Sequence, residues 1–215
     1  MALFVFARTY YSLLYEEKQT GNNSCEFSLD PNTAQKNLLL SEDKLTVTGE
    51  SEEQQYPDHK DRFMDQPQVL SSTGLTGRCY WEVQWTGRWR GVDIAVSYKI
   101  IRQRGDREEC EFGHNDQSWR LRIVGGGYFV CHNKRQTYLS STSVSGSGRV
   151  GVFLDSEAGA LSFYEVGSGG KLFHIYTFTS SFTEPLFPGF GLWYEYSALT
   201  WMEESLEIPG SLVNE

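Results

Sequence analysis

Residues able to do chemistry are present in this chain, but their spacing matches no known catalytic or metal-binding motif. The histidines follow no HExxH pattern, and no serine stands in a GxSxG turn. The cysteines form no CxxC pair, which argues against a zinc knuckle or a thioredoxin-like site. We therefore predict no metal site and no cofactor. The residues concerned are His59, His114, His132 and His174, with Cys25, Cys79, Cys110 and Cys131.

Two glycine-rich stretches partly match the sequence motifs of phosphate-binding loops. The stretch 146–151 fits GxGxxG, but that motif needs a helix to follow it, and here an apolar–polar alternation typical of a strand follows. The stretch 167–171 lacks the Ser or Thr that follows the lysine of a phosphate-binding loop. We interpret both stretches as hairpin turns and predict no nucleotide site.

Four carboxylates raise the possibility of an enzyme. A sandwich glycosidase would need two acids about 5 to 9 Å apart. Glu82 and Asp93 alternate with apolar residues, so they lie on the strand faces opposite the apolar stripes, where ordinary solvent-facing acids also lie. Asp155 and Glu157 flank a turn. We predict that the chain is not an enzyme, and a sandwich lectin or carbohydrate-active protein stays open as an alternative.

The charge balance bears on partners. The 215 residues include 19 Lys and Arg against 28 Asp and Glu, a net charge of −9 that argues against a nucleic-acid partner. The apolar run Met1–Ala7 is too short to span a bilayer, and we expect no membrane insertion. Reduced, buried thiols are favoured over two disulfides, which predicts a cytoplasmic protein.

The elements that position these residues are short strands. The stretch 149–164 contains two alternating segments around a turn, and alternation recurs at 80–85, 92–96 and 119–123. With almost no helical periodicity, the pattern predicts an all-β fold, a two-layer antiparallel β-sandwich of the concanavalin-like jelly-roll type. Residues 1–24 are expected to form an N-terminal extension, helical or disordered, and residues 203–215 an acidic tail.

Several aromatic residues stand where core packing does not explain them. Trp89 lies between two arginines in a glycine-bounded turn, and the stretch 191–196 is more aromatic than one strand face can bury. Arg122 and Val124 end a strand on the face opposite Trp119. Because interface centres concentrate Trp, Tyr, Phe and Arg, these positions are candidates for partner binding.

The order of motifs resembles the PRY-SPRY (B30.2) domain of tripartite-motif ubiquitin ligases, NOD-like receptors, butyrophilins and stonefish-type toxins. The likeness covers residues 25–201 in six blocks. The matching stretches are Ser28–Ala34 with Leu38–Glu42, Arg62–Phe63 with Pro67–Leu70, Tyr80–Val83, Asp116–Trp119, Leu154–Tyr164 and Pro185–Phe190. The resemblance implies a PRY part at about 25–70 and a SPRY part at about 71–202, forming one domain from 25 to 202.

The resemblance also implies a function and a set of site residues. It implies a non-catalytic module that binds a protein partner through its inter-strand loops, in an innate-immune or ubiquitin-ligase context. The alternatives are the C-terminal module of a pore-forming toxin and a glycan-binding sandwich. The matching positions, together with Trp89 from its local context, make the predicted partner-binding set Tyr56, Asp58, Trp89, Arg122, Val124, Tyr128, Phe190 and Trp193.

Overall fold

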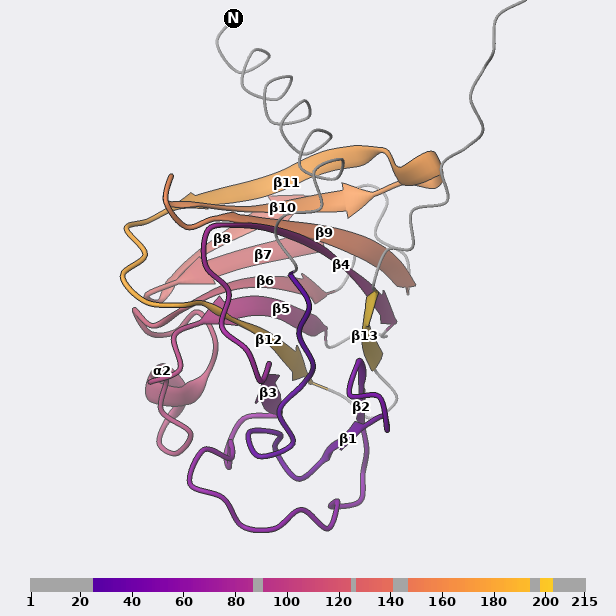
Figure 1. Cartoon of the computed structure of the whole chain (residues 1–215), viewed down its shortest axis with the longest axis vertical. Coiled ribbons are helices and arrows are strands. Elements are labelled where there is room, and N and C mark those ends of the chain that lie inside the picture. Colours follow the sequence, from indigo (N-terminus) through magenta and orange to yellow (C-terminus); the bar gives the residue numbers. More distant parts are fainter. Residues whose placement is uncertain (1–24, 87–90, 125–126, 141–146, 194–197, 203–215) are drawn as a thin grey trace, which may run out of the picture.

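The computed structural model describes residues 25–86, 91–124, 127–140, 147–193 and 198–202. The predicted N-terminal extension, the predicted acidic tail and Trp89 lie outside these residues. The described chain folds into two antiparallel sheets, and its helical elements are short: α2 (Arg107–Cys110) and the 3₁₀ turn η1 (Ser168–Gly170) (Figure 1).

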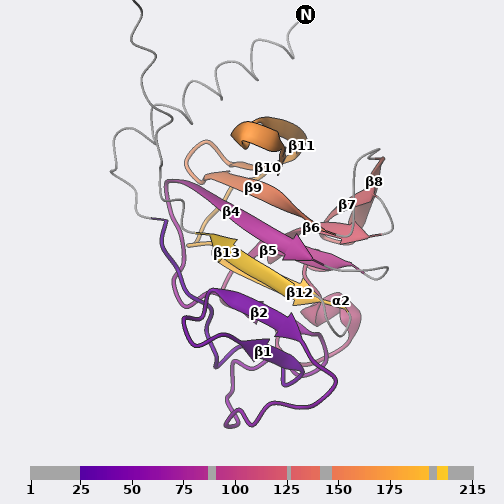
Figure 2. The ribbon, with the colours of Figure 1, turned by 90° about the vertical axis from the view of Figure 1, so that its right-hand side faces the viewer.

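The first layer is a seven-stranded sheet, whose strands succeed one another from β11 to β1 in the view of Figure 2. In spatial order its strands are β1 (Leu38–Leu40), β2 (Thr46–Gly49), β13 (Ala198–Met202), β4 (Arg78–Thr86), β9 (Ser147–Asp155), β10 (Ala160–Val166) and β11 (Leu172–Thr179). Strands distant in sequence are neighbours here, since β4 pairs with both β9 and β13.

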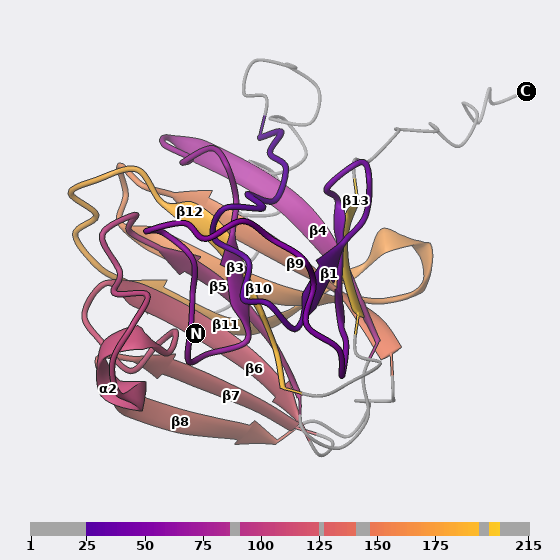
Figure 3. The same cartoon turned by 90° about the horizontal axis from the view of Figure 1, so that it is seen from below.

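The second layer is a six-stranded sheet, with β5 to β8 side by side in Figure 3. Its strands in spatial order are β3 (Gln68–Leu70), β12 (Phe187–Leu192), β5 (Val92–Ser97), β6 (Ser118–Val124), β7 (Gly127–His132) and β8 (Arg135–Ser140). The strand and helix patterns in the sequence did not indicate β8 or α2.

The core lies between the two sheets and follows from the period-two alternation of the strands. Trp81, Val83 and Trp85 of β4 are buried in it, and so are the apolar residues of the other layer. Those facing residues include Val92, Ile94 and Val96 of β5 and Trp119, Leu121 and Ile123 of β6. Sandwiches bury one apolar face of each sheet in this way. The predicted two-layer antiparallel β-sandwich is confirmed.

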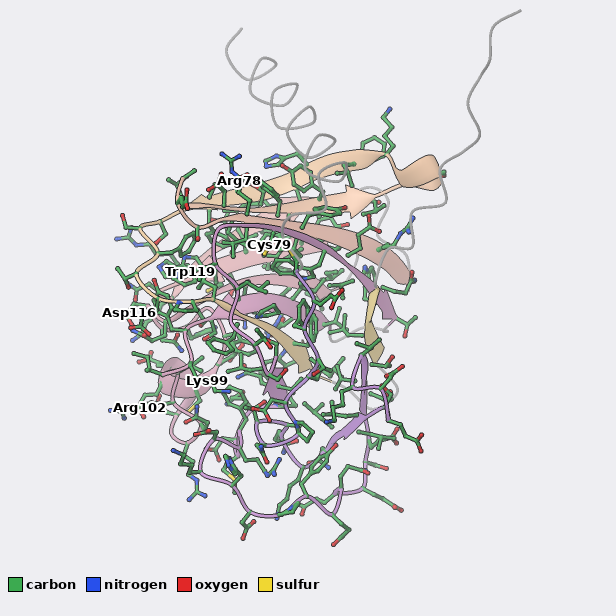
Figure 4. The ribbon with its side chains drawn as sticks, viewed as in Figure 1. Arg78, Cys79, Lys99, Arg102, Asp116 and Trp119 are labelled. Atoms are coloured by element: carbon green, nitrogen blue, oxygen red, sulfur yellow. The ribbon has the colours of Figure 1, made fainter. Side chains whose placement is uncertain are left out.

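A third, partial layer covers one half of the outer face of the six-stranded sheet. Residues 98–117, which include α2, pack there around a second buried cluster. In Figure 4, Trp119 lies among the strands, whereas Lys99, Arg102 and Asp116 lie toward the side of α2. The second cluster contains Phe63, Leu70, Ala95, Ile101 and Phe112. The other half of this face carries the candidate site.

The four cysteines form no disulfide. Cys79, Cys110 and Cys131 are buried, and burial raises the pKa of the Cys110 thiol to about 11. Burial also raises the pKa of the Cys131 thiol. The thiols of Cys110 and Cys131 are therefore protonated at neutral pH.

The hairpin between β9 and β10 has a tightly constrained turn. The Asp155 carboxylate accepts a hydrogen bond from the Ala158 backbone N–H at 2.8 Å, and Gly159 adopts a φ of +70°. A Cβ at Gly159 would collide with the backbone carbonyl oxygen of Ser180. Glycine is therefore required here both for its backbone conformation and for space.

Comparing two glycines separates these two requirements. Gly169 also has a φ of +70°, but a Cβ there would meet nothing within 4 Å. We expect Gly169→Ala to lower the free energy of unfolding by about 1 kcal/mol through backbone strain alone. Gly159→Ala should lower it by about 2 to 4 kcal/mol, because the collision adds to the strain. Urea denaturation measures both, and equal losses would contradict this account of the turn.

Candidate functional site

A row of paired residues crosses the outer face of the six-stranded sheet. Gly191 of β12 pairs with Asp93 of β5, and Asp93 pairs with Arg122 of β6. Arg122 pairs in turn with Phe129 of β7, and Phe129 with Tyr138 of β8. Because each residue alternates with a core residue of its own strand, all five face away from the core.

Trp193 lies just after β12 and is fixed over the middle of this row. Its indole Nε1–H donates to Asp93 Oδ2 at 2.7 Å. The guanidinium of Arg122 stacks on the indole ring, with Cζ 4.2 Å from the ring centroid. Arg122 also holds Asp93 with two parallel hydrogen bonds, from Nε to Oδ1 and from Nη2 to Oδ2, each 2.7 Å long. A single buried carboxylate thus sets the positions of both a tryptophan and an arginine.

The carboxylate belongs to a larger buried ion cluster. Arg122 Nη2 also donates to Glu111 Oε1 at 2.9 Å, and Glu111 accepts a further hydrogen bond from Arg120 Nη1. Arg120 Nη1 lies 3.6 Å from Asp93 Oδ2. Asp93, Glu111 and Arg120 are fully buried. Two guanidinium groups therefore face two carboxylates, so that their charges balance beneath the surface.

The pKa shifts reflect this pairing. Burial by itself would raise the pKa of the Asp93 carboxyl, but Arg122, Arg120 and the hydrogen bonds from Arg122 and Trp193 hold it below its ordinary value. Burial would likewise lower the pKa of the Arg122 guanidinium, whereas Asp93 and Glu111 raise it above the ordinary value of an arginine. Both groups stay charged across the physiological pH range.

The exposed part of the row is aromatic. The rings of Phe129 and Tyr138 lie 4.8 Å apart between centroids, and Tyr138 is 57% exposed. Gly127 allows this arrangement, because a Cβ there would come within 2.6 Å of the Tyr138 ring. Val124, Phe129 and Trp193 are half-buried. We call Arg122, Val124, Phe129, Tyr138 and Trp193 the aromatic surface.

Three of the predicted site residues come together in this surface. Arg122 and Val124 come from β6, and Trp193 comes from the segment that directly follows β12 of the same sheet. The predicted site residue Trp89 lies outside the described residues.

Tyr128 and Phe190 were predicted to bind a partner, and their positions require a correction. Phe190 is 1% exposed within the core, because it alternates with the outward-facing glycines of β12. Tyr128 is also in the core, where its hydroxyl donates to Glu165 Oε2 of the opposite sheet at 3.2 Å. Burial and Glu165 together raise the pKa of the Tyr128 hydroxyl. Neither side chain reaches the surface.

Tyr56 and Asp58 lie apart from the aromatic surface, in the segment between β2 and β3. Tyr56 is half-buried, its hydroxyl donates to the Leu38 carbonyl at 3.0 Å, and the Leu40 N–H donates to that hydroxyl at 3.2 Å. These two hydrogen bonds attach the segment between β2 and β3 to β1. Asp58 is exposed and lies 3.6 Å from Lys36 Nζ. The structure does not bring these two residues together with Arg122 and Trp193.

Asp93, Phe129 and Tyr138 belong to this site but were not among the predicted partner-binding residues. Asp93 was considered only as a candidate catalytic acid. Its alternation with Val92 and Ile94 indicated an outward face, as did that of Phe129 with Tyr128 and Val130. What was missing was the strand register, which makes these outward residues neighbours.

Three of the four carboxylates weighed as catalytic acids, namely Glu82, Asp93 and Asp155, form ion pairs. Glu82 Oε2 lies 3.2 Å from Arg149 Nη1, and Asp155 Oδ2 lies 2.9 Å from Arg78 Nε. Both pairs are on the seven-stranded sheet, whereas Asp93 is on the other sheet. Within the described ranges, no three or more His, Cys, Asp or Glu side chains gather in a way that would hold a metal ion. The same ranges contain no helix with the length and apolar character needed to cross a membrane.

Fold and surface together define a class of protein: an antiparallel β-sandwich with an aromatic surface on one outer sheet face. Family comparison agrees with this class. The SPRY domain model matches residues 78–202, and the SPRY-associated PRY model matches residues 27–75. The chain belongs to the SPRY domain family and carries the PRY part in front, as the motif order predicted.

Individual relatives come from different kinds of protein. The chain is 38% identical to neoverrucotoxin subunit alpha of Synanceia verrucosa over 175 residues, which are 80% of this chain and 24% of the toxin subunit. It is 36% identical to mouse tripartite motif-containing protein 14 over 167 residues, which are 77% of this chain and 37% of that protein. The crystal structure of the TRIM65 PSpry domain superposes with a TM-score of 0.74 at 26% identity, covering 87% of this chain and 96% of that chain.

Replacing Asp93 tests the buried cluster. Asp93→Asn keeps the side-chain shape but removes the negative charge that faces two buried guanidinium groups. We expect the free energy of unfolding at pH 7 to fall by about 3 to 5 kcal/mol, as measured by urea denaturation. Asp58→Asn, on an exposed carboxylate that also forms an ion pair, should cause no measurable loss.

The same variant makes a prediction about pH. Because the pKa of Asp93 is lowered in the folded state, its contribution to stability is complete above the unfolded pKa of about 3.9 and is lost as the pH falls through the lower folded value. The stability difference between the wild type and Asp93→Asn should therefore shrink below about pH 4. A difference that stays constant down to pH 2 would contradict the lowered pKa.

Proposed function

We propose that this chain is a non-catalytic protein-recognition module that binds its partner through the aromatic surface. The observation that carries the proposal is the fixed pair of Trp193 and Arg122 beside the exposed Tyr138. Tryptophan, tyrosine and arginine are the residues in which interface binding energy concentrates. Side chains already held in place lose little conformational freedom on binding, which favours affinity.

The electrostatics of the surface indicate the chemistry of the partner. The guanidinium of Arg122 is already held by Asp93 and Glu111, so its charge is balanced from below. What remains for a partner is the indole edge, the Tyr138 ring and its hydroxyl, and the aliphatic side chain of Val124. We infer that the partner presents an apolar or aromatic side chain rather than an acidic cluster.

The setting of this recognition is part of the proposal. Similarity to a tripartite-motif protein and to the TRIM65 domain supports a ubiquitin-ligase or innate-immune context. Four cysteines without a disulfide support a cytoplasmic location. The chain spans 24% and 37% of the two curated relatives described above, so activities of whole proteins would require further segments.

A second candidate function is a module of a toxin subunit. The observation that favours it is the 38% identity to neoverrucotoxin subunit alpha over 80% of this chain. In that setting the same aromatic surface would bind another toxin subunit. The partner captured by the intact native protein distinguishes the two settings.

Single substitutions of exposed aromatics test the surface. We expect Tyr138→Ser to weaken capture of the native partner by at least about tenfold, because it removes the most exposed ring of the aromatic surface. Phe173→Ser is the matched control, since Phe173 is 49% exposed on β11 of the other sheet. Affinity capture with quantitative mass spectrometry compares the three chains, and thermal melts confirm folding. Equal capture by all three would place the binding surface elsewhere.

Salt dependence tests the inferred partner chemistry. Because the charge of Arg122 is balanced internally, the dissociation constant should change by less than about threefold between 50 and 300 mM salt. Isothermal calorimetry with the captured partner measures this change. A loss of affinity of tenfold or more would show that an acidic partner segment is recognised instead.

A further inference from the structure

The outer face of the seven-stranded sheet carries an apolar cluster of its own. It consists of Tyr80 of β4, Phe153 of β9, Tyr164 of β10 and Leu172 of β11, and we call it the outer cluster. Tyr80 pairs directly with Phe153 across the two strands. Tyr80, Phe153 and Tyr164 stand next to core residues of their own strands, so they point away from the core.

The rings of the outer cluster are more deeply buried than their own sheet explains. Phe153 is 2% exposed and Tyr164 is 7% exposed. The aromatic surface on the opposite side of the molecule provides the comparison. There, Phe129 of the interior strand β7 also contacts a ring of the neighbouring strand, and yet it stays partly exposed. Lateral neighbours on an open sheet face thus leave a ring accessible, which indicates that the outer cluster has a cover from above.

The charged residues at the ends of the outer cluster indicate that the segment covering it is apolar. Arg78 pairs with Asp155 at one end, and Arg149 pairs with Glu82 at the other, at distances of 2.9 and 3.2 Å. The charges around the cluster therefore already pair with one another. A segment that covers these rings gains mainly from burying apolar area.

The described chain begins beside this cluster. The Cys25 thiol lies 3.9 Å from the Arg78 carbonyl oxygen. Two residues later the chain enters the core, where Phe27 packs edge-on against Trp81 with 6.0 Å between centroids. Arg78, labelled in Figure 4, starts β4 only two residues before Tyr80. Residues 1–24 therefore join the described chain at the edge of the outer cluster.

The sequence of residues 1–24 contains the apolar side chains that a segment covering the outer cluster needs. It contains the apolar run Leu3–Phe6, and Tyr10, Leu13 and Leu14 have the spacing of one helix face. At about 1.5 Å per residue, 20 helical residues span about 30 Å. The distance from β4 to β11 is three strand spacings, about 15 Å. The segment is long enough to cross the cluster.

We propose that residues 1–24 bind the outer cluster of the same chain through their apolar side chains. The outer cluster and the aromatic surface lie on the outer faces of different sheets, at opposite sides of the sandwich. The contact therefore holds the N-terminal segment away from the aromatic surface and leaves that surface accessible. This contact does not depend on whether the aromatic surface binds a partner.

Photocrosslinking in the full chain tests the contact. A benzophenone amino acid replaces Leu13, and crosslinked peptides are identified by mass spectrometry after irradiation at low protein concentration. We expect crosslinks within one chain to the peptides that contain Tyr80, Phe153 or Tyr164. Crosslinks between two chains would show that a second copy is the cover and would overturn the proposal. Crosslinks to the peptide of Tyr138, or none at all, would overturn it as well.

Matched variants exclude a fortuitous crosslink. Phe153→Ser, in the chain with the benzophenone, should reduce the crosslink yield at least about fivefold, since it removes the centre of the cluster. Phe129→Ser, on the outer face of the other sheet, should leave the yield unchanged. If Phe153→Ser does not fold, Tyr80→Ser replaces it, because Tyr80 is only partly buried. A folded variant of either kind with an unchanged yield contradicts the proposal.

Discussion

The candidate site depends on one buried carboxylate. Asp93 accepts two hydrogen bonds from Arg122 and one from Trp193, and the guanidinium of Arg120 lies beside it. A buried ion cluster adds little net stability compared with apolar packing, but removal of one member leaves unpaired charges in a dry environment. The main structural effect of the ion cluster is therefore to hold the guanidinium of Arg122 against the indole ring of Trp193 at the surface. Arg122 and Trp193 are held in place because Asp93 of the sheet and Glu111 of the adjoining layer bind them from below.

The two outer faces of the sandwich differ in how they are covered. On the six-stranded sheet, residues 98–117 cover one half around Phe63 and Phe112, and Glu111 from this layer completes the ion cluster. The layer thus both supports the aromatic surface and sets its border. On the seven-stranded sheet, the outer cluster is buried on what would otherwise be a solvated face. Antiparallel sheets commonly leave one face to solvent, so the covered regions mark where further segments contact the sandwich.

The comparisons show how much sequence change this architecture tolerates. The TRIM65 domain shares 26% identity and still superposes with a TM-score of 0.74. The fold requires apolar residues on one face of each strand, and many residues meet that requirement. The residues on the outer faces of the sheets need not be apolar, because they do not pack in the core. Under the proposed function, outward residues carry recognition, so a shared sandwich does not imply a shared partner.

The sequence by itself determined the class of fold and the face on which most residues lie, because period-two alternation places Trp119, Leu121 and Ile123 inward and Arg122 outward whatever the strand pairing. It did not show that Tyr128 and Phe190 are core residues, because both were assigned by likeness to the family rather than by alternation. Only the tertiary structure decided which outward residues meet. Asp93, Arg122, Phe129 and Tyr138 become neighbours through the register of four strands, and Trp193 joins them from a fifth segment about 100 residues after Asp93. Register is set by packing and loop geometry across the whole domain, which no local pattern contains.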